Sequence, residues 1–176
     1  HAIPAKPDDV VAVLSALPPA NREAVQKLLE SIYANGTVDA YNPSKFTEMR
    51  RYEEGNWFPG QGANPPWTQL WDHGGHPNGG NSSGGVQTVV RRWMSTFEGT
   101  AHIYGNLFRY HNKEMLGIYG GIQVNGNPVW LSWKHPKKST EFSIYVPVEK
   151  GSKIDFLLDS AGDDGSDSTR YVAVIA

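Results

Sequence analysis

The pattern of apolar and polar positions divides the chain into a short helical part and a longer part made of strands. Within residues 8–35, apolar residues recur three and four positions apart, and the second of two such runs comprises Ala24, Val25, Leu28, Leu29 and Ile32. This spacing places them on one face of a helix. Pro18-Pro19 separates the two runs and Asn35-Gly36 ends the second. The pattern therefore predicts a helical hairpin.

From about residue 37 the helical period gives way to alternation, with breaks at Gly, Pro and Asn every few residues. Alternation is clearest in residues 141–148, whose apolar side chains would share one face of a strand. The dipeptide Asn125-Gly126 predicts a tight hairpin. We expect at least seven strands, which include residues 86–94, 99–109, 117–124, 128–133, 141–148, 154–158 and 170–175.

The region between the helices and these strands is less regular. Residues 51–58 resemble a strand and a turn, and a Gly- and Pro-rich stretch follows as far as Trp67. Residues 71–81 contain four glycines and predict a long loop. Long loops inside compact domains are often functional.

Short strands with frequent turns are typical of an all-β fold. We therefore expect an antiparallel β-sandwich of the jelly-roll-like type over residues 37–176, with the helical hairpin at its N-terminal end. Residues 1–36 would form an N-terminal helical segment or the remnant of a linker to a neighbouring domain. A role for this segment in docking a partner is the alternative.

Composition narrows the functional classes. The 176 residues carry a formal net charge of -2 and no cysteine. The charge gives no electrostatic reason to expect nucleic acid, and the lack of cysteine excludes disulfides, zinc–thiolate sites and thiol catalysis. No apolar run approaches the roughly 20 residues that cross a bilayer. Six Trp and eight Tyr residues are available for packing or for stacking on a ligand.

The chain from about residue 52 to residue 175 resembles a β-sandwich domain family of secreted multidomain bacterial proteins. The motifs that carry the resemblance are HPNGGN at 76–81, VVRRWMSTFEGTAHIYGNL at 89–107, VNGNPVW at 124–130 and VPVEKGSKIDFLLD at 146–159. The last of these is also similar to the final strands of jelly-roll carbohydrate-binding modules. The resemblance implies a sandwich fold, secretion or display at the cell surface, and a place within a larger protein.

Aromatic residues near Gly- and Pro-rich loops are the first candidates for ligand contact. The C–H faces of a pyranose are apolar and pack against a flat ring, whereas the hydroxyl groups at its edge need polar partners. Trp57, Trp67 and Trp71 lie in or beside such loops. Each could equally close an end of the sandwich. Trp93 ends an apolar strand and is expected in the core.

A second candidate surface is a sheet face. Trp130 and Trp133 are three residues apart on one expected strand and would point to opposite faces. At most one is expected in the core. The other could line a concave face together with Arg109, Tyr110 and Tyr119, although ordinary cross-strand packing explains these residues equally well.

Two metal sites are conceivable. The acidic turn offers oxygen ligands for Ca²⁺ from Asp159, Asp163, Asp164 and Asp167. It lacks the EF-hand pattern, and the alternative is a solvated turn with local hydrogen bonds.

His1 resembles the first residue of the copper-binding histidine brace of lytic polysaccharide monooxygenases, because an N-terminal His offers two nitrogen ligands to copper. The residues after His1 do not match the openings of those enzymes. The second ligand would be one of His73, His76, His102, His111 and His135.

These observations favour a carbohydrate-binding module without catalytic activity, part of a larger secreted or cell-surface protein that acts on polysaccharide. Its partner would be a polysaccharide or oligosaccharide, without nucleic acid and without membrane insertion. No Gly-x-Ser-x-Gly, phosphate loop or HExxH motif is present. The alternatives are a copper-dependent enzyme that uses His1, and a structural or protein-docking sandwich.

Overall fold

The computed structural model describes residue 49 and residues 51–58, 67–79, 87–111, 117–134, 139–160 and 165–176. The expected helical hairpin lies outside these residues. Among them there is no helix long and apolar enough to cross a lipid bilayer. The described elements are β1 (Arg51–Glu53), β2 (Asn56–Phe58), β3 (Gln69–Trp71), β4 (Gly74–His76), β5 (Val89–Met94), β6 (Gly99–Arg109), β7 (Ile118–Val124), β8 (Asn127–Lys134), β9 (Thr140–Val148), β10 (Lys153–Asp159) and β11 (Thr169–Ile175).

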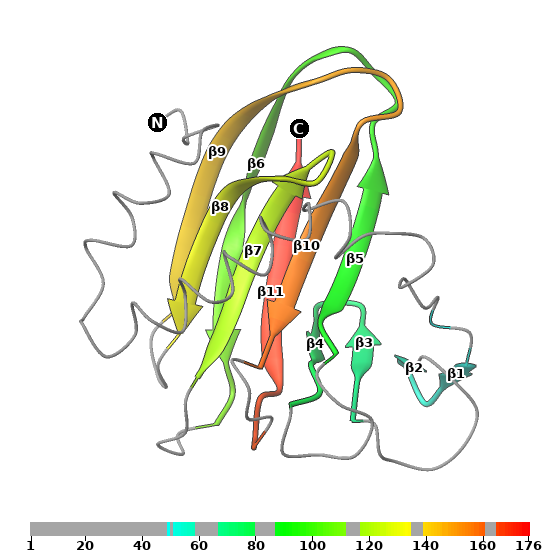
Figure 1. Cartoon of the computed structure of the whole chain (residues 1–176), viewed down its shortest axis with the longest axis vertical. Coiled ribbons are helices and arrows are strands. Elements are labelled where there is room, and N and C mark those ends of the chain that lie inside the picture. Colours follow the sequence, from blue (N-terminus) through cyan, green and yellow to red (C-terminus); the bar gives the residue numbers. More distant parts are fainter. Residues whose placement is uncertain are drawn as a thin grey trace.

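The strands form two antiparallel sheets of unequal size. The larger sheet has seven strands in the order β1-β2-β3-β4-β11-β6-β9, and the smaller has four in the order β5-β10-β7-β8. Figure 1 shows them as two stacked layers, with β7 and β10 over β6 and β11. The predicted all-β, antiparallel, two-sheet sandwich is confirmed for the described residues.

The core lies between the two inner faces. In β9 the burial of alternate residues follows the predicted alternation, with Phe142, Ile144, Val146 and Val148 buried. Residues of the smaller sheet pack against them, among them the buried Ile122, Ile154, Phe156 and Leu158. Each such side chain contributes about 1.5–3 kcal/mol when it is fully buried. Apolar burial between the layers is therefore the main force that holds the sandwich together.

Tyr171 joins the two layers by a polar contact. Its ring packs edge-on against Phe142 and Phe156, with ring centroids 5.9 Å away in each case. Its hydroxyl crosses from β11 to β7 and donates a hydrogen bond of 2.8 Å to the carbonyl oxygen of Gly121. The phenol is thus satisfied inside the core, as a buried hydroxyl requires.

Two tight turns form where the sequence favours them. Asn125 and Gly126 have φ angles of 51° and 84°, and they join β7 to β8. Glu54 and Gly55 have φ angles of 48° and 84°, and they join β1 to β2. Positive φ at both central residues matches the twist of antiparallel strands. The predicted hairpin at residues 125–126 is confirmed.

The prediction of a long loop over residues 71–81 is wrong for its first part. Residues 69–76 form the β3–β4 hairpin, and β4 pairs with β11. A Cβ on Gly74 would collide with the carbonyl oxygen of Thr169, and a Cβ on Gly75 would lie 3.0 Å from Cγ1 of Val89. These glycines are therefore needed for close packing between strands, and they do not mark a loop.

Candidate functional site

The hairpin of β1 and β2 presents two aromatic rings to solvent. Tyr52 and Trp57 are cross-strand partners, with ring centroids 5.0 Å apart and ring planes inclined by 47°. Tyr52 is 61% exposed and Trp57 is 42% exposed. We call these two residues the hairpin pair. Backbone pairing on both sides of the turn fixes the two rings relative to each other.

Register shows which face of the sheet carries the hairpin pair. Trp57 lies opposite Leu70, and Leu70 lies opposite Gly75. Gly75 faces the smaller sheet, and Leu70 packs against the core. Cross-strand partners share a face of an antiparallel sheet, so the hairpin pair continues the inner face of the larger sheet. Because both rings are exposed, the smaller sheet does not cover this end of the inner face.

Trp67 is a third exposed ring, at 44%, two residues before β3 begins. Its backbone N–H donates a 2.8 Å hydrogen bond to Oδ1 of Asn78. Asn78 is fully buried and exchanges two backbone hydrogen bonds with Gln87, of 3.0 and 2.9 Å. The indole is thus carried by a backbone segment that is anchored to the folded domain.

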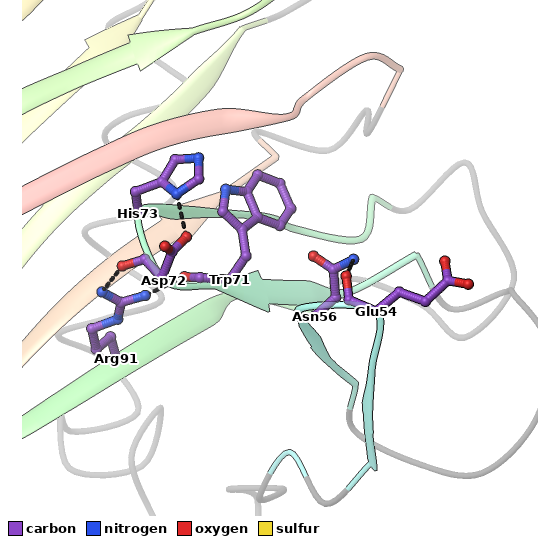
Figure 2. A network of polar contacts seen from close by, with 6 residues as sticks. All are labelled: Glu54, Asn56, Trp71, Asp72, His73 and Arg91. Carbon is purple, nitrogen blue, oxygen red and sulfur yellow. Dashed lines mark hydrogen bonds and ion pairs between the residues drawn. The ribbon is translucent and has the colours of Figure 1, made fainter.

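Figure 2 shows how the neighbouring β3–β4 turn is held. Arg91 of β5 donates hydrogen bonds to the carbonyl oxygens of Trp71 and of Asp72, the latter at 2.6 Å. Burial lowers the pKa of Arg91, and the negative charge of Asp72 acts in the opposite direction. The guanidinium therefore links the smaller sheet to the end of the larger one that carries the hairpin pair.

Trp71 contributes less to the surface than Trp57 and Trp67 do, because it is half-buried. Its indole lies beside the imidazole of His73, with ring centroids 6.5 Å apart and an edge-on arrangement (Figure 2). Nδ1 of His73 contacts the carboxylate of Asp72. The three loop tryptophans expected from the sequence thus divide into two exposed rings and one that packs on its own hairpin.

The residues expected to line a sheet face do not share one. Arg109 is buried and forms a 2.7 Å ion pair with the buried Asp167, and it donates a hydrogen bond of 2.9 Å to the carbonyl oxygen of Gly165. Tyr110 is the next residue and is 43% exposed. Tyr119 is on the other sheet and is buried. Neighbouring residues of a strand point to opposite faces, so the structure separates these three side chains.

The two other tryptophans of interest lie on the smaller sheet. Trp130 is half-buried and packs against the core, with its ring 4.7 Å from that of Phe142. Trp133 lies in β8 with its backbone opposite Tyr119. Trp93, which was expected in the core, is half-buried and packs against it.

The acidic residues are placed as follows. Asp159 is buried at the end of β10 and accepts a 2.6 Å hydrogen bond from Oγ1 of Thr88. The carboxylate of Asp167 binds Arg109, whereas Asp163 and Asp164 lie outside the described residues. In the part of the chain that the structure describes, no three His, Asp or Glu residues are grouped as a metal site. Calcium binding stays a prediction.

Copper binding also stays a prediction, because His1 and His135 lie outside the described residues. Of the other histidines, His76 contacts the carbonyl oxygen of Pro77 through Nδ1 at 2.7 Å, and His111 is exposed. His102 belongs to a ring cluster on β6.

That ring cluster was missed by sequence reasoning. His102, Tyr104 and Tyr145 lie together on β6 and β9, and the two tyrosines are 40% and 53% exposed. The sequence signal was present in β9, where Tyr145 occupies a polar position of an alternating strand. An aromatic residue at such a position is expected to face solvent.

Comparisons with known proteins give no further guide to the site. No family model, no curated protein and no solved structure matches the chain. The fold class therefore rests on the arrangement of the strands, and an inference about function rests on the exposed side chains.

Proposed function

We propose that this domain binds carbohydrate without acting on it, and that the hairpin pair and Trp67 supply the stacking surface. The observation that carries the proposal is the exposed, paired arrangement of Tyr52 and Trp57 on adjacent strands. Monomeric soluble proteins expose large apolar patches chiefly where they bind a partner. Flat rings bind by contact and perform no chemistry of their own.

The geometry of the hairpin pair suits an extended glycan. Successive sugar rings of a twisted polysaccharide chain are inclined to one another, and the ring planes of Tyr52 and Trp57 differ by 47°. Each aromatic ring could then pack on a different sugar of one chain. Glu54 lies in the turn that joins β1 to β2 and is exposed, so its carboxylate is available to sugar hydroxyls. Asn56 precedes Trp57 on β2 and its side chain points to the other face, where Nδ2 donates a 3.5 Å hydrogen bond to the carbonyl oxygen of Glu54 (Figure 2).

The biological setting is part of the proposal. The motif resemblance favours a module within a larger protein that is secreted or displayed at the cell surface. The ligand is then a polysaccharide outside the cell, and the module would hold its neighbours close to that substrate. Calcium bound by the acidic turn between Asp159 and Asp167 would stabilise the fold. It would not contribute to stacking, because Tyr52 and Trp57 lie on β1 and β2 and Trp67 precedes β3.

Binding of the purified domain to a panel of soluble polysaccharides tests the proposal. Affinity electrophoresis and calorimetry, with Ca²⁺ and with a chelator, should find at least one that binds. Trp57→Ala should weaken binding by roughly tenfold or more, since about 1.4 kcal/mol is a factor of ten. The control is Met94→Ala, because Met94 is 55% exposed on β5 and carries no ring. Failure of the whole panel to bind, or full binding by Trp57→Ala and Tyr52→Ala, would contradict the proposal.

A further inference from the structure

A second group of aromatic rings lies on the outer face of the larger sheet. His102 stacks on Tyr145 with ring centroids 4.3 Å apart and planes inclined by 9°. The ring of Tyr104 also lies beside this imidazole, with ring centroids 4.8 Å apart and planes inclined by 33°. We call His102, Tyr104 and Tyr145 the outer triad. The imidazole of His102 therefore contacts both tyrosine rings and joins them into one aromatic cluster.

The outer triad faces away from the core. Ile103 and Leu107 alternate with its residues on β6 and are fully buried. The imidazole is fixed by a second contact, since its Nε2 lies 2.8 Å from Oγ of Ser143 on β9. These contacts hold the rings in place before any ligand arrives, and pre-organisation of this kind lowers the entropic cost of binding.

The surroundings of the outer triad indicate the class of ligand. Cross-strand pairing places Val174 and Ser143 beside Tyr104, and it places Thr100 opposite Pro147 at the end of the same face. These side chains are uncharged, and the exposed Glu141 lies on the same face of β9, two residues before Ser143. Flat rings with hydroxyl neighbours and one carboxylate complement a neutral pyranose chain better than a sulfated or acidic one, because the carboxylate repels anionic groups.

The outer triad and the hairpin pair lie on opposite faces of one sheet. The hairpin pair continues the inner face through Leu70 and Gly75, whereas the outer triad alternates with buried inner-face residues of β6. Four strand spacings separate β2 from β6, which is about 19 Å at about 4.8 Å per spacing. A glycan that lies flat on one surface does not continue onto the other, because it would have to pass around an edge of the sheet.

From this arrangement we infer that the domain carries two separate glycan-binding surfaces and joins two neutral polysaccharide chains. The inference rests on the proposed function for the class of ligand, and it adds the second site and the bridging. The larger sheet then acts as a rigid spacer between two weak sites, and simultaneous engagement of both raises the overall affinity for a dense polysaccharide without any new contact.

Calorimetry counts the sites. A short neutral oligosaccharide that binds the wild-type domain should titrate with two sites per chain. Trp57→Ala and Tyr145→Ala should each leave one site, and the double variant should leave none. Tyr145→Phe is the matched control, because it keeps the ring and should keep both sites. Tyr104→Ala provides a second test of the outer triad should Tyr145→Ala fail to fold.

Bridging is measured with a long neutral polysaccharide in solution, for example hydroxyethyl cellulose, xylan or galactomannan, chosen as the one that the wild-type domain binds. The wild-type domain should raise light scattering and viscosity, whereas each single variant should bind without raising either. Sedimentation velocity without sugar tests the alternative that a second copy of the chain, and not a glycan, covers the outer triad. Self-association that Tyr145→Ala abolishes would overturn the inference.

The outcomes separate the two proposals. One site per chain that Trp57→Ala removes and Tyr145→Ala leaves intact overturns the second site and keeps the proposed function. One site that Tyr145→Ala alone removes overturns the two-site inference and moves the binding surface to the outer triad. No binding of any polysaccharide overturns both.

Discussion

Tyr119 places a phenol hydroxyl in a buried position on β7, where it has no hydrogen-bond partner among the described residues. A buried polar group without a partner costs roughly 1–3 kcal/mol. Tyr119→Phe removes the hydroxyl and keeps the ring, so we expect a free energy of unfolding that is unchanged or higher. Denaturant titration of the two proteins measures the difference. A clear loss of stability in the variant would show that the hydroxyl makes a contact in solution.

The same phenol makes stability sensitive to alkali. Burial, and after it the negative charge of Asp159, raises the pKa of Tyr119 to about 12, whereas tyrosine in an unfolded chain has a pKa of about 10. The phenol therefore ionises more readily in the unfolded chain than in the folded one, so the free energy of unfolding is unaffected by this group below pH of about 10 and falls as the pH rises through about 12. The free energy of unfolding should fall over this window, and less steeply in Tyr119→Phe. Equal slopes for the two proteins would contradict the assignment.

The ion pair of Arg109 and Asp167 fixes the turn before β11, because both side chains are buried. Removal of one member leaves the other charge buried and costs about 3–5 kcal/mol. Arg109→Met should therefore destabilise the domain strongly. The double variant Arg109→Met with Asp167→Leu should recover part of the loss, because neither charge then remains buried. Unfolding free energies of the single and double variants form the test, and additive losses would contradict it.

At the scale of elements, the β3–β4 hairpin joins β1 and β2 to the rest of the larger sheet. Gly74→Ala would place a Cβ against the backbone of β11, and strain of this kind typically costs about 1–3 kcal/mol. It should also weaken glycan binding through the hairpin pair. Gly121→Ala is the control, because its Cβ would meet the flexible end of Leu131 at 3.3 Å. Denaturant unfolding and calorimetry report the two effects, and equal stabilities of the two variants would refute the role of Gly74.

The elements differ in how well the sequence predicts them. β6 spans Gly99–Arg109 as expected, since glycine and polar turns bound a long alternating run. β3 and β4 were missed, because each has three residues and β4 is mostly glycine. A glycine that permits close strand packing and a glycine that permits a turn look the same in a sequence.

The sequence predicted some of the site residues and misplaced others, because exposure and pairing depend on residues that are distant in sequence. Trp57 and Trp67 were candidates for ligand contact from their Gly- and Pro-rich surroundings, with closure of a sandwich end as the equal alternative, and the structure leaves both exposed. Arg109 was expected on a sheet face and is buried, because a carboxylate 58 positions further along the chain pairs with it. Its partner in space could not be read from its neighbours in sequence.

At the scale of the whole molecule, the unequal size of the two sheets is the feature that matters for function. Four strands cannot cover seven, so part of the inner face of the larger sheet stays open at β1 and β2. The outer face of the same sheet carries the outer triad on β6 and β9. A β-sandwich with one sheet longer than the other can thus present ring surfaces on both faces of a single rigid layer.

The sequence by itself determined that the second part of this chain forms short antiparallel strands, and which side chains of a strand such as β9 share a face. These properties depend on local conformation and on alternation along the backbone. The tertiary structure alone decided which faces are covered. Tyr119 and Tyr145 both point away from the space between the sheets, yet Tyr119 is buried and Tyr145 is 53% exposed. Burial depends on what the rest of the chain packs against a face, and alternation along one strand carries no information about that.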